Sequence, residues 1–566
     1  MNDKKIVIWG AGRIGRGFVG DIFNAANYQI TFVDQSSELV NALINNKKYR
    51  VVRAASKDDI SAVDISNYAA LHSSQISEIG EAIHSANIMA IAVYPQNFEE
   101  VASQLKAPLL DRFRKSVALL NILLCTNLVH AGPKFEALLV AGLSDEDRKI
   151  MEAKTGVVET LVIRICPDPP ENVRKEFPLI VWTNGYASLP VNKSGFKGYL
   201  PDMDTFRYVA DMRAEEQRKM YTYNMCHAVL SYHGHMAGHE LLVDCLADEG
   251  IRKEATEALE EVSQALQKKH GFSKEAMDEW IKGVITQTNN PTVGDTVVRS
   301  ANDPLRKLKR EDRLIGPALL CLDNDIQPYS IIRAIGAAFH YKEGNDQASI
   351  KLQKLIREKG IRKTIIEVCG LADDENGLVQ KILAEYQNSA VRIELMKKAR
   401  EAYQLGFDYE KTYHGCGQCV IAAMTEVLDN FDKEVFESAT GLSGGVGLIN
   451  QNTCSAYTAG VMVFGMCYPR RRENFDGDRE NKYTTFGLAQ SLHQKFLDEY
   501  GSVCCGDIHT RKYGRAYDLS KKTERELFED AGGHGQDGCT EVVGKAAKWA
   551  LVLISEEQMK KPNQGN

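Results

Sequence analysis

Residues 5–18, KIVIWGAGRIGRGF, decide how the first part of this 566-residue chain folds. A short apolar run predicts a strand that ends in Gly10, Gly12 and Gly15, which have G-x-G-x-x-G spacing and precede a helical pattern. Glycines at this spacing permit a tight turn, close approach of the backbone to a pyrophosphate, and close packing of helix on strand. The N-terminus of the helix then favours the bound anion. The residues expected to bind a dinucleotide in this loop are Gly10, Gly12, Arg13, Ile14 and Gly15.

The next apolar run, residues 28–33, predicts a second strand that is closed by Asp34. A carboxylate at this place in a β-α-β unit accepts hydrogen bonds from the ribose hydroxyls of the cofactor. Gln35 and Ser36 follow it, so no arginine is ready to receive a 2′-phosphate, which favours NAD over NADP. A helix cap or a turn is the simpler interpretation of Asp34.

Hydrophobic patterning beyond this unit predicts three regions. Apolar runs at 88–93 and 117–124 are nearly continuous, as is typical of buried parallel strands, and they indicate a doubly wound α/β sheet of the Rossmann type. From about residue 205 the periodicity becomes that of long helices, with one helix expected to end near Asn388. The expected domains are a Rossmann-like NAD-binding domain at 1–200, an all-α substrate domain at 201–388 and a mainly helical, cysteine-rich domain at 389–566.

Composition narrows the class of protein. Hydrophobic residues make up 44% and charged residues 26% of the chain, which are the proportions of an ordinary globular protein. The formal net charge is −7 and basic residues are interspersed with acidic ones, unlike the basic surface of a nucleic-acid binder. The N-terminus shows no signal-peptide pattern, and no apolar window is long enough to span a membrane. We therefore expect a cytoplasmic protein that binds a small molecule, with its oligomeric state left open.

The segment RKMYTYNMCHAV, residues 218–229, carries the residues expected to do the chemistry. On a predicted helix, Lys219, Asn224 and His227 project to one side. Oxidising an alcohol by hydride transfer requires the hydroxyl to lose its proton, and a desolvated lysine with a lowered pKa can accept it. Asn224 and His227 can hydrogen-bond the developing alkoxide, so no metal is needed. The alternative is a solvated lysine beside a core histidine.

Further motifs occur together with these in one known family. They are Cys125-x-Asn127, FKG at 196–198, and DPLRKL with DRLIGP within 303–317. With the glycine loop and the K-x4-N-x2-H helix, they closely resemble the polyol-specific long-chain dehydrogenase family, also called the mannitol dehydrogenase family. The resemblance runs from residue 1 to about residue 388.

This resemblance implies an NAD-dependent oxidoreductase that interconverts a sugar alcohol phosphate and a keto-sugar phosphate. Mannitol 1-phosphate and fructose 6-phosphate are the first candidates. It implies that Lys219 is the general base, that Asn224 and His227 stabilise and position the substrate, and that no metal takes part. It also implies that Asn127 helps to form the substrate pocket.

Three positions depart from the family pattern and leave the substrate open. Tyr94 stands where the family has a glycine, Thr126 replaces an acidic residue, and Ile163 replaces the aspartate that precedes Arg164. We therefore expect a reshaped pocket. A hexuronate reductase, acting on fructuronate or tagaturonate, and a dehydrogenase of an unphosphorylated polyol remain alternatives. A binding protein that senses NAD or redox state is the alternative from another class.

Cysteines crowd the last third of the chain. Seven of the 13 lie there: Cys416, Cys419, Cys454, Cys467, Cys504, Cys505 and Cys539. An odd number in a reducing compartment indicates free thiols, metal ligands or redox chemistry rather than a disulfide framework.

The order of these cysteines resembles a redox-active family named for its C…GCAxxG…C…C pattern, over about residues 395–555. The matching positions are Cys419, Cys454 and either Cys504 or Cys505, with Ser455 departing from the motif. Thiolates at separate helix termini could ligate an iron–sulfur cluster or another soft metal, or exchange disulfides; buried inert cysteines are the alternative. The candidate residues are Cys416, Cys419, Cys454, Cys504 and Cys505.

Overall fold

The computed structural model describes residues 4–560 apart from 117, 127, 129, 170, 374 and 431. Contacts within the chain divide it into two compact units, Met1–Gln387 and Asn388–Asn566. Among the described residues, no helix combines the length and the apolar character needed to cross a membrane.

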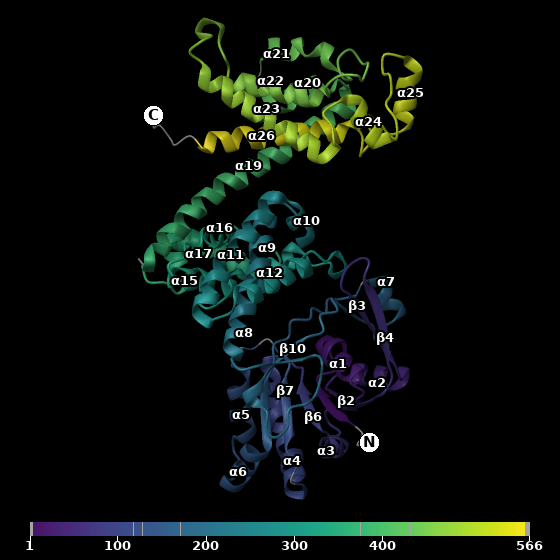
Figure 1. Cartoon of the computed structure of the whole chain (residues 1–566), viewed down its shortest axis with the longest axis vertical. Helices are drawn as coiled ribbons and strands as arrows, with labels where there is room; N and C mark the ends of the chain where they lie inside the picture. The colour runs from purple at the N-terminus through teal and green to yellow at the C-terminus, as the bar shows by residue number, and fades with distance from the viewer. Residues whose placement is uncertain are drawn as a thin grey trace. The chain divides into compact units, whose positions relative to one another are not determined.

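The first unit is built on a six-stranded sheet in which all neighbouring strands run parallel (Figure 1). Its strands are β1 (Lys5–Trp9), β2 (Gln29–Asp34), β5 (Tyr68–His72), β6 (Ile88–Ile91), β7 (Leu120–Leu124) and β8 (Thr155–Glu159). Their order in the sheet is β5-β2-β1-β6-β7-β8, so the direction of winding reverses between β1 and β6. Open α/β sheets bind ligands at the carboxyl ends of the strands beside such a reversal.

Strand β1 shows why the apolar run in the sequence is continuous. Ile6 and Ile8 belong to one hydrophobic core, whereas Val7 and Trp9 belong to the core on the opposite face. Successive side chains of a strand point to opposite faces, and here helices cover both. These helical segments are η1 (Gly15–Val19), α1 (Gly20–Ala25), α2 (Ser37–Asn46), α3 (Ile76–Ser85), α4 (Phe98–Lys115), α5 (Ala131–Val140) and α6 (Asp145–Lys154). The predicted doubly wound Rossmann sheet is confirmed.

Two small sheets extend this part of the fold, and the sequence patterns did not predict them. One has the order β4-β3-β9 and the other pairs β10 with β11. Their strands are β3 (Tyr49–Ala54), β4 (Ile60–Ile65), β9 (Val181–Thr183), β10 (Leu189–Asn192) and β11 (Phe206–Val209).

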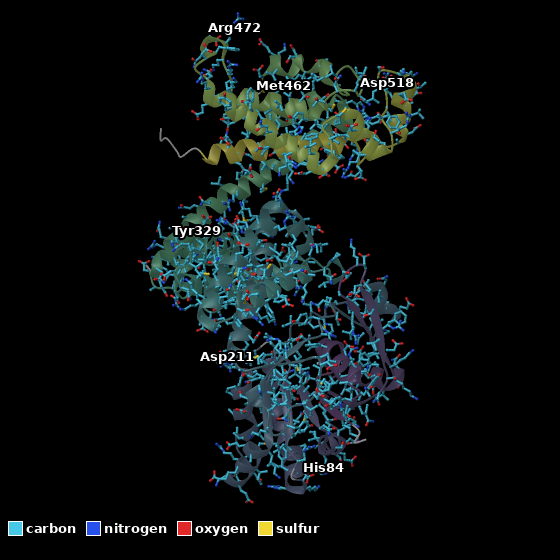
Figure 2. All side chains as sticks on the ribbon, viewed as in Figure 1. His84, Asp211, Tyr329, Met462, Arg472 and Asp518 are labelled. Carbon is cyan, nitrogen blue, oxygen red and sulfur yellow. The ribbon has the colours of Figure 1, made fainter. Side chains whose placement is uncertain are left out.

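The rest of the first unit is helical. Asp211, labelled in Figure 2, caps the first of these helices by accepting a hydrogen bond from the Ala214 N–H. The chain then passes through α8 (Met212–Lys219), the π-helical turn η4 (Met220–Asn224) and α9 (Met225–Ala237). The larger helices packed around them include α11 (Glu249–His270), α12 (Lys274–Thr288), α15 (Ile315–Leu322), α16 (Tyr329–Ala338), α17 (Gln347–Lys359) and α18 (Ile361–Cys369).

The predicted end of one helix is wrong. The helix expected to end near Asn388 is α19 (Leu378–Tyr413), which continues for 36 residues. Residues 388–413 contain one glycine and no proline, so no residue there stops a helix. Within this stretch Leu395, Ala399 and Ala402 follow helical spacing and are buried in the core of the second unit.

The second unit is helical, as predicted. Its largest helices after α19 share one hydrophobic core that is rich in alanine and aromatic residues. They are α20 (Cys416–Val427), α22 (Ser455–Cys467), α23 (Arg479–Tyr500) and α26 (Cys539–Lys560). Shorter helices complete the unit: α21 (Lys433–Ser438), α24 (Cys505–Tyr513) and α25 (Lys522–Asp530).

Candidate active site and thiol cavity

The loop between β1 and η1 uses its three glycines for three different physical reasons. Gly10 has φ of +101°, and a Cβ there would lie 2.5 Å from the carbonyl oxygen of Ala92. A Cβ on Gly15 would lie 1.8 Å from the Gly10 oxygen, so the helix packs on the loop as closely as glycine allows. Gly12 instead faces open space, which leaves room for a group to approach the backbone.

Asp34 lies at the carboxyl end of β2 beside this loop. Its carboxylate accepts hydrogen bonds from the backbone N–H groups of Ala11, at 2.7 Å, and Ser36, at 2.9 Å. These bonds fix the carboxylate, and each oxygen keeps a lone pair for a ligand. Asp34, Gly10 and Gly12 line a cavity of about 190 Å³ at the point where the winding of the sheet reverses. Tyr94 also lines it and is 71% exposed.

Gly15, Arg13 and Ile14, the other expected loop residues, are not among the residues that line this cavity. The Arg13 guanidinium forms an exposed ion pair with Asp168, at 2.8 Å. Ile14 lines a different cavity, which it shares with Lys219.

Lys219 is the last residue of α8, directly before the π-helical turn η4. Hydrogen bonds in a π-helix join residues five apart, and Asn224 is five residues beyond Lys219. The turn therefore brings the two side chains closer in direction than the regular helix expected from the sequence. Both line the same two cavities. Single π-turns inside α-helices are frequent at functional sites.

The surroundings of Lys219 favour its neutral form. Its Nζ donates a hydrogen bond to the carbonyl oxygen of Val162, at 2.7 Å. Burial and then the positive charge of Arg313 lower its pKa to about 8, against an opposing effect of Glu216. A lysine that titrates near neutral pH can accept and return a proton.

His227 is neutral in this site. Burial lowers its pKa to about 4, despite the opposing effect of Asp295. Its Nε2 lies 3.1 Å from Thr288 Oγ1, and that hydroxyl donates its proton to the carbonyl oxygen of Val284. The other ring nitrogen, Nδ1, lies 3.9 Å from a carboxylate oxygen of Asp295, so both sides of the ring are held by polar groups.

Two cavities, of about 330 and 340 Å³, share Lys219, Asn224 and a set of cationic side chains. Arg306 and Arg313 line both, and each is held by a carboxylate, Asp303 at 2.9 Å and Asp312 at 2.7 Å. Burial, then Arg313 and Arg306, lower the pKa of Lys307 to about 7. Besides Lys219 and the buried Arg164, which pairs with Asp21, the cationic residues around these cavities are Arg299, Arg306, Lys307 and Arg313, called here the cationic set.

Sequence reasoning did not assign a role to this cationic set, although three of its members stand in the DPLRKL and DRLIGP motifs. Two of the three positions that depart from the family pattern lie around the same cavities, whereas Tyr94 lines the cavity beside Asp34. Thr126 lines one and Ile163 the other. Arg164 is buried, and it bonds the Gly17 carbonyl oxygen at 2.8 Å and pairs with Asp21. The expected pocket residue Asn127 lies outside the described residues.

In the second unit, four cysteines at the N-termini of four helices line one cavity of about 260 Å³. Cys416, Cys505 and Cys539 begin α20, α24 and α26, and Cys454 caps α22. The partial positive charge of a helix N-terminus stabilises thiolates and other anions. Of the residues expected from the sequence, Cys416, Cys454 and Cys505 come together here, and Cys539 joins them.

The two remaining candidates are not among the residues that line this cavity. Cys419 is buried and donates from Sγ to the carbonyl oxygen of His414, at 3.3 Å. Cys504 precedes α24 as its N-cap.

The thiols of this cavity are protonated at neutral pH. Burial raises the pKa of Cys454 to about 11, and it raises those of Cys416, Cys505 and Cys539 further. The Nε2 atom of His509 lies 3.6 Å from Cys539 Sγ and 3.9 Å from Cys505 Sγ. Burial lowers the pKa of His509 to about 4, so its imidazole is neutral too.

Comparisons with known proteins match the first and the last parts of the chain to different families. Residues 4–205 match the mannitol dehydrogenase Rossmann domain, and residues 211–390 match the mannitol dehydrogenase C-terminal domain. Residues 414–553 match a family described as "Putative redox-active protein (C_GCAxxG_C_C)". Both resemblances seen in the sequence are thereby confirmed.

The relatives fall in the same family. A mannitol-1-phosphate 5-dehydrogenase of Caldanaerobacter subterraneus subsp. tengcongensis is 31% identical over 384 residues, which are 68% of this chain and 97% of the relative. One of Halalkalibacterium halodurans is 31% identical over 368 residues, 65% of this chain and 96% of the relative.

Two solved structures share the fold. A substrate-free D-sorbitol dehydrogenase has a TM-score of 0.58 at 14% identity and covers 71% of this chain and 96% of its own. A Pseudomonas fluorescens mannitol 2-dehydrogenase, in a ternary complex with NAD and D-mannitol, has a TM-score of 0.55 at 14% identity, covering 69% and 94%. The chain belongs to the mannitol dehydrogenase family, a family of NAD-dependent polyol dehydrogenases.

Proposed function

We propose that residues 1–388 interconvert mannitol 1-phosphate and fructose 6-phosphate with NAD, and that Lys219 is the general base. One observation carries this proposal: a lysine with a pKa of about 8 shares its cavities with an amide side chain and a set of cations. The curated relatives of this chain are mannitol-1-phosphate 5-dehydrogenases, which supports the same reaction.

The glycine loop fits the cofactor. Gly12 leaves open space at the backbone, and Asp34 keeps lone pairs for the ribose hydroxyls. When bound, NAD supplies the acceptor for the hydride from the carbon that carries the reacting hydroxyl. Gly10, Gly12, Arg13, Ile14, Gly15 and Asp34 are the residues proposed to hold it.

The proton is handled by Lys219. In the oxidation direction its neutral amine accepts the hydroxyl proton, so that the alcohol becomes a ketone as the hydride leaves. In the reduction direction its ammonium returns that proton to the oxygen. Asn224 donates a hydrogen bond to the reacting oxygen, and His227, held by Thr288, positions the substrate. Asn127 is proposed to help to form this pocket.

The cationic set supports a substrate that carries a phosphate. A phosphate dianion attracts guanidinium and ammonium groups through charge-assisted hydrogen bonds. Arg306 and Arg313 line both cavities, so they can bind one end of a molecule whose other end lies at Lys219. A hexuronate, which carries a carboxylate, is the second candidate, and an unphosphorylated polyol makes the least use of these charges.

A substrate panel tests this proposal. NADH oxidation by the purified full chain is measured with fructose 6-phosphate, fructose and fructuronate. We expect the highest kcat/KM with fructose 6-phosphate. A higher value with fructuronate would make the enzyme a hexuronate reductase, and a higher value with fructose would make it a dehydrogenase of unphosphorylated polyols. NADH binding without turnover of any of them would indicate a sensing protein.

For the second unit, we propose that the cavity thiols bind an iron–sulfur cluster or another soft metal. Four cysteines at four helix N-termini around one cavity support this, because thiolate ligands select such metals and the helix termini favour their negative charge. Thiol–disulfide exchange is the alternative. We expect anaerobically purified protein to contain iron and sulfide, or zinc, held by thiolates, and to lose this thiolate-bound metal on Cys454→Ser substitution. Protein without metal whose thiols resist mild oxidants would leave these cysteines a structural role.

A further inference from the structure

His414, Glu529 and His534 form a group of possible metal ligands on the wall of the thiol cavity. One ligand atom from each residue lies within 4.8 Å of those of the other two. His414 directly follows α19, Glu529 is near the end of α25, and His534 lies in the loop before α26. Segments distant in the sequence therefore bring two imidazoles and a carboxylate to one place.

The contacts within this group leave it with more hydrogen-bond acceptors than donors. His534 Nδ1 lies 2.6 Å from Glu529 Oε1, and its Nε2 lies 3.6 Å from an oxygen of Glu410. The rings of His414 and His534 have centroids only 3.9 Å apart. The Glu529 carboxylate and the two imidazoles thus share a small volume in which a single cation can contact all three, and Glu410 lies at the other ring nitrogen of His534.

Glu410 supplies an independent observation. Its side chain is only 4% exposed, it lines the same cavity, and its second oxygen, Oε2, has no hydrogen-bond partner. Leaving a buried carboxylate oxygen unsatisfied costs free energy, on the order of 1–3 kcal/mol or more for a charged group. A bound cation removes this cost, so Glu410 points to a positively charged ligand.

We propose that the C-terminal unit binds a divalent transition-metal ion, of the zinc or iron(II) class, through His414, His534 and Glu529, with Glu410 beside the second ring nitrogen of His534. Imidazole nitrogens with carboxylate oxygens are a donor set that suits zinc and iron. Calcium and magnesium are excluded as the preferred ions, because they favour sites made of oxygen ligands alone. Two carboxylates balance the charge of a divalent ion.

This site is separable from the thiol centre proposed above, with which it shares only the cavity. Its ligands are nitrogen and oxygen atoms, so the metal does not require any of the four cysteines. The ion would bind on the wall of the thiol cavity, which is also lined by Cys416, Cys454, Cys505 and Cys539. A cation there also stabilises the thiolate forms of these cysteines.

The test uses the full-length protein, stripped of metal by a chelator and titrated with Co²⁺ as a spectroscopic probe. We expect one Co²⁺ per chain that shows visible d–d absorption without the intense near-ultraviolet band of thiolate-to-cobalt charge transfer and is displaced by Zn²⁺; Co²⁺ held by the cavity thiols would give that band and is counted separately. His414→Ala and His534→Ala should each weaken binding by about tenfold or more, and Glu410→Gln should weaken it too. His493→Ala is the matched control, because His493 lies on α23 in the same unit and is not among the residues that line the cavity.

Cys454→Ser distinguishes the two centres. We expect this variant to keep, with unchanged affinity, the Co²⁺ that shows d–d absorption alone, and to lose any Co²⁺ that gives the charge-transfer band. Absence of binding to the wild-type chain would overturn the proposal. So would binding that survives both histidine substitutions, shows charge-transfer absorption and is lost in Cys454→Ser, although that result would support the thiol centre. Circular dichroism confirms that each variant is folded.

Discussion

Lys219 is the residue on which the proposed dehydrogenase chemistry depends. Lys219→Ala should lower kcat by about 10²–10⁴-fold, because a positioned general base typically contributes this much. NADH affinity should change little, since the glycine loop and Asp34 lie on the cavity at the reversal of the sheet. Steady-state NADH oxidation and NADH fluorescence titration measure the two effects. Lys282→Ala, an exposed lysine on α12, is the control, and near-normal turnover in Lys219→Ala would remove the lysine from the mechanism.

The pKa of Lys219 sets the expected pH dependence. Alcohol oxidation needs the neutral amine, so kcat/KM should rise with pH and level off above a pKa of about 8. Ketone reduction needs the ammonium and should fall as pH rises through the same value. His227, with a pKa of about 4, stays neutral over this range and adds no second step. Profiles in which both directions change with pH in the same sense would contradict this assignment.

Asp34 is expected to determine the choice of cofactor. Asp34→Ala removes an acceptor for the ribose hydroxyls and the negative charge that repels a 2′-phosphate. NADH should bind more weakly and the preference over NADPH should shrink. Because Asp34 also accepts the N–H groups of Ala11 and Ser36, Asp34→Asn serves as the second variant, keeping the shape of the side chain without its charge. An unchanged preference in both variants would place the ribose elsewhere.

At the scale of elements, regular segments could be predicted from the sequence and local irregularities could not. The glycine loop and β1 can be recognised in the sequence, because a buried parallel strand is apolar on both faces and the loop needs glycine. The π-turn η4 has no such sequence pattern, since it inserts one residue into an otherwise helical stretch. The continuation of α19 past Asn388 was missed because a boundary was inferred where the composition changes, although no helix-stopping residue stands there.

The role of the cationic set could not be predicted from the sequence, for a different reason. Arg306 and Lys307 lie on α14 (Pro304–Lys307), and Arg313 lies in the turn before α15. Charged residues at such places usually face solvent. Their convergence on the cavities of Lys219 depends on packing between elements distant in sequence, which spacing along one element does not reveal. The DPLRKL motif supported the resemblance without indicating what its charges contact.

The next prediction concerns Arg306, a member of the cationic set. Arg306→Gln should raise KM for fructose 6-phosphate by about 10–100-fold, because a hydrogen bond to a charged group contributes about 1.5–3 kcal/mol. Activity with fructose should change little. Arg357→Gln, an exposed arginine on α17, is the control. Equal losses with both substrates would mean that Arg306 acts by holding Asp303 and the local fold.

At the scale of the whole molecule, the chain joins two chemistries that use separate residues. The cofactor loop, Lys219 and the cationic set all lie before residue 388, and the thiol cavity and the histidine group lie after it. The match to the mannitol dehydrogenase C-terminal domain ends at residue 390, and the match to the cysteine family begins at residue 414. Each part therefore contains the residues proposed for its own site.

Truncation within α19 tests whether the first unit is active without the second, and which residues of α19 the first unit needs. A fragment of residues 1–388 should keep dehydrogenase activity within about twofold, since it retains every residue proposed for the reaction and the contacts of α19 with the first unit. Those contacts include His340 Nε2 donating to the Tyr386 carbonyl oxygen, at 2.7 Å, with the two rings stacked at 4.0 Å.

A fragment of residues 1–377 should instead fail to fold. It loses Leu378, Val379 and Ile382, which are fully buried, and burial of such side chains contributes about 1.5–3 kcal/mol each. Together they approach the roughly 5–15 kcal/mol that stabilises a whole domain. NADH oxidation and thermal unfolding of both fragments measure the difference. If 1–388 were folded yet inactive, the second unit would have to take part in the reaction, and the two chemistries of this chain would be coupled.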